Sequence, residues 1–262
     1  MRYFDLDLGS SLQDVVRHLR NKTLVIVEDA PGATDRLVRM VWNAATILRH
    51  RRLNRSWGRN AKLVVSEQLV ENPMVLRSLH PDDRTVLDFG GVESVLPLQL
   101  AALGVEVTVL DQRAYPFRRP RLRTIRADVL KDTLDAGPFD AVISVSTIEH
   151  VGLGRYGDVV DADGDRSAVS RLWSMVRPGG RLIATVPAGA PATQRGYRVY
   201  DEARVRATFP NVTATRWFMK DGREGVWLEA DATRAAGLVY SRPEGEAPAE
   251  AVVIVECRKP AA

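Results

Sequence analysis

The sequence of 262 residues has little cysteine and no long apolar run. Its single cysteine, Cys257, cannot form an internal disulfide, so we expect a cytoplasmic protein. No apolar run approaches the ~20 residues that span a bilayer. The opening segment, MRYFDLDLGS, carries acids where a signal peptide has an apolar core. We therefore expect no membrane among the partners of this protein.

Charge of one sign does not dominate the chain either. The 37 lysines and arginines exceed the 33 acids by four, for a formal net charge of +4. Arginines gather at 49–59 and at 118–123, which would suit a nucleic acid or a phosphorylated ligand. The same clusters are also typical of solvated helix ends and surface loops. The modest net charge argues against nucleic acid as the partner.

From about Arg84 onward, short β-branched runs alternate with amphipathic segments, which is typical of a parallel α/β sheet. The pattern predicts strands at 85–90, 105–111, 122–130, 139–147, 181–187, 212–220 and 251–258. It predicts helices at 96–104, 166–176 and 201–209, and an exposed loop within 225–250. The domain is therefore expected to cover residues 81–262.

Residues 1–80 are predicted to form an α-rich N-terminal extension. The pattern there indicates a strand at 23–29, a helix at 33–51 and a helix at 66–79 that is interrupted near Pro73. Three roles stay open for this extension: a cap on the sheet, the surface of a homodimer, or a cover over a substrate.

A strand, a glycine turn and a helix follow one another in VLDFGGVESVLPLQLAALG. Gly90 lets backbone N–H groups approach a ligand, and the next helix presents its positive N-terminus. Asp111 ends the second strand, where an acid can accept both hydroxyls of a ribose. These features suit NAD or S-adenosylmethionine (SAM). Two details favour SAM. The pattern G-x-G-x-x-G, which is typical of NAD sites, is missing. Asp88 would repel a pyrophosphate but attract a cationic amino-acid tail.

The stretch from Val86 to Pro187 resembles class I SAM-dependent methyltransferases, with Asp88, Gly90, Asp111, Asp128, the FDAVIS strand and the RPGGRL turn in that family's order. The resemblance implies a Rossmann-like, doubly wound sheet of seven strands whose last strand is antiparallel. It departs from the family at Val92, where a glycine is expected, so that either the loop takes another path using Gly91 or cofactor binding is weakened. The implied SAM site comprises Asp88, Gly90, Gly91, Glu93, Ser94, Asp111, Gln112, Asp128, Val129, Ser146 and Thr147.

The stretch STIEHVGLGRYGD, residues 146–158, follows the fourth strand, at the edge where ligands collect in this architecture. His150 is the candidate general base, because its ordinary pKa of about 6.5 leaves neutral imidazole available near pH 7. Asp158 would orient His150 or act as the base, and Glu149 is the third catalytic candidate. The alternative is that the Glu-His pair only caps the strand and packs.

Contacts to the acceptor are predicted in this stretch and in the loop after the fifth strand. The candidates are Arg155, Tyr156, Tyr197, Arg198 and Tyr200. A surface connector whose aromatic rings pack inward is the alternative for the second loop.

No metal is expected, although Asp161, Asp163 and Asp165 alternate as in a calcium loop. Arg166 and Leu172 stand where such a loop needs glycine and glutamate, so the acids are predicted to cap the next helix.

The sequence therefore predicts SAM-dependent methyl transfer to a small polar acceptor. A motif E-S-x-L-P after the glycines resembles a subgroup of methyltransferases that act on sugars and other small molecules, which implies a sugar or natural-product hydroxyl. Two alternatives stay open. One is a SAM-fold protein without activity that serves as a scaffold in a biosynthetic complex, as Val92 would suggest. The other is an RNA methyltransferase, as the arginine clusters would suggest.

Overall fold

The computed structural model describes residues 5–6, 66–194, 196–220, 226–240 and 250–261. The chain divides into two compact units, Met1–Val64 and Val65–Ala262. Of the first unit only the short strand β1 (Asp5–Leu6) is described. The strand predicted at 23–29 and the helix predicted at 33–51 lie outside the described residues, as does most of the predicted extension.

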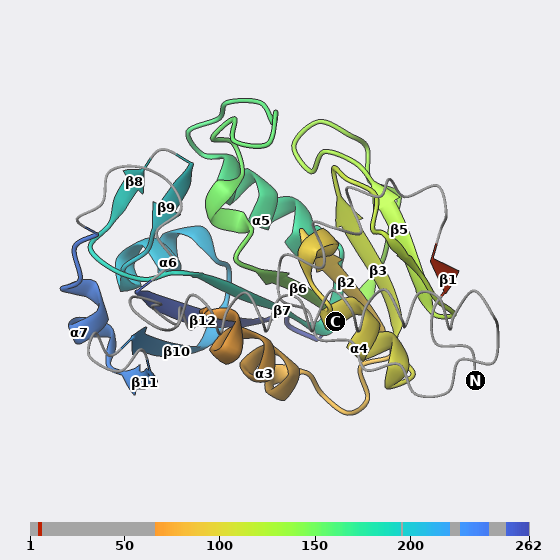
Figure 1. The fold of residues 1–262 in the computed structure, drawn as a ribbon, viewed down its shortest axis with the longest axis horizontal. Helices are drawn as coiled ribbons and strands as arrows, with labels where there is room; N and C mark the ends of the chain where they lie inside the picture. The colour runs from red at the N-terminus through yellow and green to blue at the C-terminus, as the bar shows by residue number, and fades with distance from the viewer. Residues whose placement is uncertain (1–4, 7–65, 195, 221–225, 241–249, 262) are drawn as a thin grey trace, which may run out of the picture. The chain divides into compact units, whose positions relative to one another are not determined.

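The second unit is built on an eight-stranded sheet, in the order β11-β10-β12-β7-β6-β2-β3-β5 (Figure 1). Five strands run parallel: β2 (Thr85–Phe89), β3 (Glu106–Asp111), β5 (Leu122–Arg126), β6 (Phe139–Val145) and β7 (Val176–Pro187). The last strand, β12 (Ala251–Arg258), runs antiparallel to β7 and to β10 (Val212–Lys220). The predicted doubly wound α/β class and its antiparallel last strand are therefore confirmed.

An eighth strand, β11 (Trp227–Ala230), joins the sheet at its edge by pairing with β10. The helix α7 (Ala232–Ala236) follows directly, and the side chain of Asp231 accepts a hydrogen bond from the N–H of Arg234 at its start. The exposed loop predicted within 225–250, the stretch RPEGEAPAE at 242–250, lies outside the described residues except for Glu250. The sequence pattern predicted neither β11 nor α7. Both are five residues or shorter, and β11 shows no alternation of buried and exposed residues, so the sequence carries no periodic signal for them.

Helices cover both faces of the sheet, because the central parallel strands are apolar on both sides. On one face lie α5 (Gly164–Ser174), α6 (Glu202–Thr208) and α7, whose buried side chains include Leu172 and Val205. On the other face lie α3 (Gln68–Ser78) and α4 (Leu96–Ala102), where Val75 and Leu100 pack against the sheet. The unit therefore has three layers.

The helix α3 runs through Pro73 without interruption, which corrects the prediction of a break there. Proline removes the hydrogen bond that residue 73 would donate to the carbonyl four residues earlier, that of Leu69. The side chain of Leu69 is exposed, so water can reach this turn of the helix.

Shorter elements lie in the connections: β4 (Phe117–Arg118), β8 (Ala192–Gln194), β9 (Tyr197–Val199) and the 3-10 turns η1 (Gly91–Glu93) and η2 (Ile148–His150). β8 and β9 form an antiparallel hairpin of their own. None of the helices in the described ranges has both the length and the apolar character that a membrane span requires.

The packing of α5 can be tested with Leu172→Ala. Leu172 is fully buried against the sheet, so its truncation should lower the free energy of unfolding by about 2–5 kcal/mol. Leu103→Ala is the matched control, because that leucine is 75% exposed and should change stability little. Urea unfolding followed by circular dichroism measures both, and similar losses in the two variants would contradict this packing.

Candidate functional site

The glycine turn after β2 packs closely against the residues that follow β6. Gly90 has a φ of 77°, and a Cβ atom there would lie 2.2 Å from Cγ2 of Thr147. Both its conformation and its surroundings therefore require glycine. The turn brings the predicted cofactor residues Gly90, Gly91 and Thr147 together at one edge of the sheet.

Val92, where the resemblance leads one to expect glycine, lies in η1 and is buried. Positive φ values outside glycine occur, among the described residues, at Arg121, Ser146 and Asn211. Val92 thus needs none of glycine's conformational freedom, and the left-handed residue of this turn is Gly90 rather than Gly91. The effect of Val92 on cofactor binding stays a prediction.

Asp88, at the end of β2, carries a buried carboxyl group without a full set of partners. Its Oδ2 atom has no hydrogen-bond partner among the described residues. Burial, with the nearby charge of Asp111, raises the pKa of Asp88 to about 8. A Cβ atom at Gly91 would lie 2.5 Å from this oxygen, so glycine leaves the carboxyl group room. A buried acid of this kind can accept hydrogen bonds from a cationic ligand.

Asp111 ends the neighbouring strand β3, two residues beyond Val109, the residue that pairs with Asp88. Its Oδ1 atom accepts a hydrogen bond of 2.9 Å from the N–H of Arg113, and the Arg113 guanidinium also forms an ion pair of 2.6 Å with Glu93. Ser94 Oγ accepts from the N–H of Leu96, at the start of α4. These contacts hold the loop after β2 and the tip of β3 in one arrangement.

Three other predicted cofactor residues follow β3 and β5. The carboxyl group of Asp128 accepts from the N–H of Leu130 and lies 3.4 Å from Nζ of Lys131, so it shapes its own turn. The carbonyl of Gln112 accepts from Nε of Arg126, and Val129 is buried. Their contact with a cofactor stays a prediction.

At the end of β6, Ser146 has a φ of 44°, which is uncommon outside glycine. Its hydroxyl donates a 2.7 Å hydrogen bond to Oε1 of Glu71, and the hydroxyl of Thr185 on β7 donates to the same oxygen at 2.7 Å. Glu71 comes from α3, and its burial raises its pKa to about 7. Residues in such backbone conformations cluster at functional sites.

Glu71 was missed by reasoning from the sequence. The available signal was its spacing, because it lies four residues before Val75 and so on the same, buried face of α3. An acid on a core-facing stripe of a helix is rare unless it is paired or functional.

The η2 turn places Glu149 and His150 next to Ser146 and Thr147. Nδ1 of His150 contacts the carbonyl oxygen of Gly196, and since a carbonyl can only accept, Nδ1 carries the proton. In the neutral ring Nε2 then keeps its lone pair, and this atom lies 3.7 Å from Oε1 of Glu149. Burial lowers the pKa of His150, so the neutral form prevails near pH 7.

Asp158 organises the loop that follows η2. Its carboxyl group accepts hydrogen bonds from three backbone N–H groups, those of Gly152, Gly154 and Tyr156, at 2.6, 3.3 and 3.2 Å. Nδ1 of His150 contacts the carbonyl of Gly196 rather than Asp158, so the prediction that Asp158 orients this ring is wrong. The other predicted role of Asp158, that of the base, stays a prediction.

Arg198 and Tyr200, predicted to contact the acceptor, are buried in a network that holds the same loop. The Arg198 side chain is 1% exposed, and its guanidinium donates to the backbone carbonyls of Val151, Asp161 and Ala162. The Tyr200 hydroxyl donates to Oδ2 of Asp165 at 2.8 Å. These polar groups are already used within the protein, so the prediction of substrate contact is corrected for Arg198 and Tyr200.

Asp165 is likewise a buried partner of Tyr200 and of Arg198, rather than a solvent-exposed helix cap. Asp163 occupies the N-cap position of α5 without a capping hydrogen bond from its side chain. In the part of the chain that the structure describes, no group of three or more His, Cys, Asp or Glu side chains is arranged to hold a metal ion.

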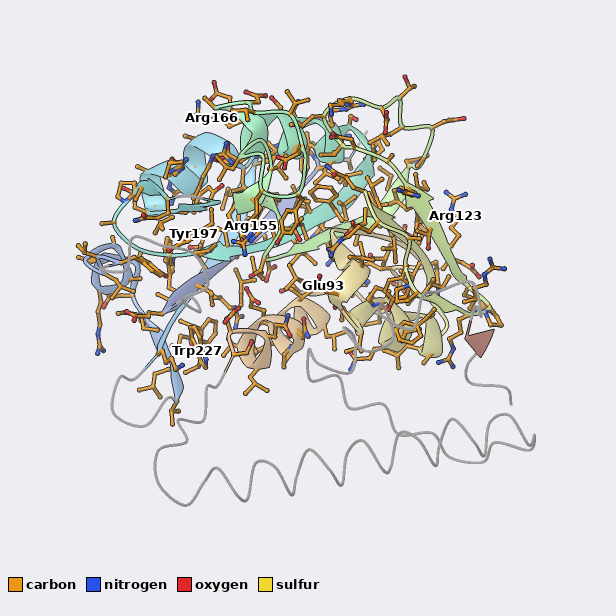
Figure 2. The ribbon with its side chains drawn as sticks, turned by 45° about the horizontal axis from the view of Figure 1, so that its top comes forward. Glu93, Arg123, Arg155, Arg166, Tyr197 and Trp227 are labelled. Atoms are coloured by element: carbon orange, nitrogen blue, oxygen red, sulfur yellow. The ribbon has the colours of Figure 1, made fainter. Side chains whose placement is uncertain are left out.

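Tyr156 and Arg155 remain near the surface beside His150. The ring of Tyr156 packs edge-on against the His150 ring at 5.8 Å between centroids, and the guanidinium groups of Arg113 and Arg155 each lie 5.6 Å from its centroid. Figure 2 shows Arg155 and Tyr197 toward the middle of the molecule, whereas Arg123 points outward. Tyr197 is mostly buried, against Tyr240. The acceptor contacts predicted for Arg155, Tyr156 and Tyr197 stay predictions.

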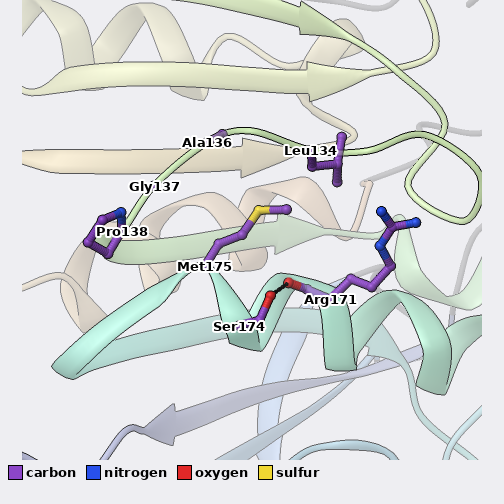
Figure 3. A pocket seen from close by; sticks show the side chains of 7 residues that line it. All are labelled: Leu134, Ala136, Gly137, Pro138, Arg171, Ser174 and Met175. Carbon is purple, nitrogen blue, oxygen red and sulfur yellow. Dashed lines mark hydrogen bonds between the residues drawn. The ribbon is translucent and has the colours of Figure 1, made fainter.

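A pocket of about 330 Å³ lies elsewhere, beside the start of β6 and the end of α5 (Figure 3). Of its seven lining residues, Arg171 is the charged one. The strands begin on this side, so the pocket is separate from the loops that carry Asp88, Asp111 and His150.

Comparison with known proteins adds two findings from sequence. Residues 105–239, just over half of the chain, match the family described as "Caenorhabditis protein of unknown function, DUF268". An uncharacterized methyltransferase of Mycobacterium bovis and one of Mycobacterium tuberculosis are each 30% identical over 118 residues, or 42% of this chain and 54% of the relative. The chain thus spans about half the length of the curated relatives it matches.

Among solved structures, the N-methyltransferase NodS from Bradyrhizobium japonicum is 15% identical, with a TM-score of 0.50 over 74% of this chain and 96% of that one. The 1,6-didemethyltoxoflavin-N1-methyltransferase of Burkholderia thailandensis is 16% identical, with a TM-score of 0.48 over 89% of this chain and 93% of that one. The likeness to NodS shows that the chain has the Rossmann-like methyltransferase fold.

The buried carboxyl group of Asp88 has a consequence for stability. Since its pKa is raised to about 8 in the folded protein, the unfolded chain releases this proton at a lower pH, and stability falls as the pH rises toward 8. Asp88→Asn removes that loss. We expect the variant to gain stability over the wild type between pH 5 and pH 8, at up to about 1.4 kcal/mol per pH unit.

Urea unfolding at pH 5 and pH 8 measures this difference. Asp135→Asn is the control, because Asp135 is exposed. A stability difference between Asp88→Asn and wild type that is the same at both pH values would contradict the burial of an unpaired acid.

Proposed function

Since the chain belongs to the DUF268 family of proteins of unknown function and has the methyltransferase fold, we propose that it is an enzyme that transfers the methyl group of SAM to a small polar acceptor. The observation that carries the proposal is the buried, partly unpartnered carboxyl group of Asp88 beside the Gly90–Gly91 turn. The mycobacterial relatives support it, because each is named an uncharacterized methyltransferase.

The residues at the glycine turn fit SAM. The Oδ2 atom of Asp88 can accept a hydrogen bond from the ammonium group of the methionine part, which would favour the charged carboxylate. Asp111, at the tip of β3, can accept from ribose hydroxyls with the oxygen that Arg113 does not use. Bound SAM would supply an electrophilic methyl group on a positively charged sulfur.

The protein's own part in the reaction is to align the acceptor and remove a proton from it. His150 suits the second task, because its neutral ring keeps the Nε2 lone pair while Gly196 fixes the other nitrogen. Tyr156 and Arg155 lie beside it and offer donors and a ring face to an acceptor. A sugar or natural-product hydroxyl is the acceptor that the sequence resemblance implies.

For the alternative of a scaffold without activity, Val92 is weaker support than the sequence suggested, because its backbone does not adopt the positive φ that would require glycine. For RNA methylation the structure adds no support, since Arg121 in the second arginine cluster forms a 2.8 Å ion pair with Glu106. A cytoplasmic location and a homodimer stay predictions from the sequence.

Calorimetry with SAM and with S-adenosylhomocysteine (SAH) tests the cofactor. We expect binding below millimolar concentration, in line with the ~1 μM–1 mM range of enzyme substrates. Asp111→Ala should weaken it by about tenfold or more, which is roughly 1.4 kcal/mol, whereas the exposed Asp135→Ala should not. If neither ligand binds the wild type at millimolar concentration, the proposal is wrong.

His150→Ala tests the general base. We expect turnover to fall by about 10²–10⁴-fold, because the acceptor proton loses its base, while SAM affinity stays unchanged. His80→Ala is the matched control, since that histidine side chain is 54% exposed. SAH release with a panel of sugars, alcohols and amines measures turnover, and unchanged turnover in His150→Ala would remove its role. SAM binding without turnover on the whole panel would instead favour the scaffold.

A further inference from the structure

Three acidic side chains converge near the ends of β6 and β7. Glu67 directly precedes α3, Glu71 lies in its first turn, and Glu149 lies in η2. Glu71 and Glu149 are only 0% and 2% exposed. The three are close enough in space that the charges of Glu71 and Glu67 help to raise the pKa of Glu149. A group of acids this deep in a protein calls for a partner.

The described residues provide hydrogen-bond partners for only some of the carboxyl oxygens of these acids. Oε1 of Glu71 accepts hydrogen bonds from the Ser146 and Thr185 hydroxyls. Oε2 of Glu71, Oε2 of Glu149 and Oε2 of Glu67 are each buried without a hydrogen-bond partner among the described residues. The charge of Arg155 lowers the pKa of Glu149, but this effect is smaller than the opposite effects of burial and of the charges of Glu71 and Glu67. Unpaired buried carboxyl groups are costly, so such a group usually has a function.

A cation suits this position better than a neutral group, because a positive charge beside the carboxyl groups would favour their charged form and offset the repulsion among them. The described residues do not include a set of acidic, histidine or cysteine side chains that could hold a metal ion. An alkylammonium group can supply the positive charge in place of a metal ion. It brings one charge and up to three N–H donors, as in lysine. A hydroxyl brings one donor and no charge, so it would leave the acids uncompensated.

The acids lie beside the residues that the proposed reaction would use. Glu149 is the neighbour of His150, with 3.7 Å between their side chains, and Glu71 holds the strained Ser146 that follows β6. We infer that the methyl acceptor carries a protonated amine, which binds against the carboxyl groups of Glu71 and Glu149. This inference rests on the proposed function and narrows its acceptor to a class of compounds, whether a sugar or another small molecule.

Binding to pairs of probes that differ only in this group tests the inference. Protein saturated with SAH is titrated calorimetrically with a panel of primary amines, each matched with the alcohol of the same skeleton. 2-Phenylethylamine with 2-phenylethanol and glucosamine with glucose are two such pairs. We expect at least one amine to bind about tenfold or more tightly than its alcohol.

Glu71→Gln and Glu149→Gln each replace an acid by a neutral group of the same shape, and a glutamine at position 71 can still accept from Ser146 and Thr185. Each variant should lower amine affinity by about tenfold or more and leave SAH affinity unchanged. Glu229→Gln is the control, because Glu229 is exposed on β11. Thermal unfolding should show the two buried variants at least as stable as the wild type, since each loses a buried carboxyl group whose Oε2 atom has no partner among the described residues.

The outcomes separate the two proposals. If SAH does not bind, the proposed function itself fails. If SAH binds but no amine exceeds its alcohol, or if the glutamine variants bind the preferred amine as the wild type does, then the inference of an amine-bearing acceptor is overturned while the proposed function stands.

Discussion

The parallel pairing of β3, β2, β6 and β7 determines where the central candidate residues Asp88, Asp111 and Ser146 lie. In this register Phe89 at the end of β2 stands between Leu110 on β3 and Ser144 on β6. The chain therefore leaves neighbouring strands at one edge, and Asp88, Asp111 and Ser146 come together although they are far apart in sequence. Because helices bury both faces, the polar groups at that edge have few routes to water. Burial then raises the pKa values of Asp88, Glu71 and Glu149.

Much of the central fold was predictable because the central parallel strands β2, β3 and β6 consist mainly of buried, apolar residues. The bounds of β10 and β12 match their predicted ranges, and Asp88 and Asp111 lie at the strand ends where they were expected. Glu71 was not found, because its role depends on contacts with Ser146 and Thr185, 75 and 114 residues away. Contacts between residues so far apart leave no periodic pattern in the sequence. β11 also lacks such a pattern, because its buried and exposed residues do not alternate.

The loop after η2 shows how a motif can mislead about roles. Its acids and aromatic residues suggest several catalytic groups, yet Asp158 binds three backbone N–H groups of its own loop. Arg198 binds the carbonyls at both ends of that loop from β9. Loops turn their polar backbone groups inward only where side chains satisfy them. Most of the charge in this region thus supports the shape that presents His150 and Tyr156.

The close approach of Gly90 to Thr147 links the turn after β2 to the end of β6, two segments that both carry predicted cofactor residues. A side chain at position 90 would overlap the Thr147 side chain, and the φ of 77° would remain unfavourable even if Thr147 were reduced to a smaller residue. Substitutions at the two positions are therefore not independent. A substitution that adds a side chain to the turn after β2 would also displace the end of β6, the segment that leads into Glu149 and His150.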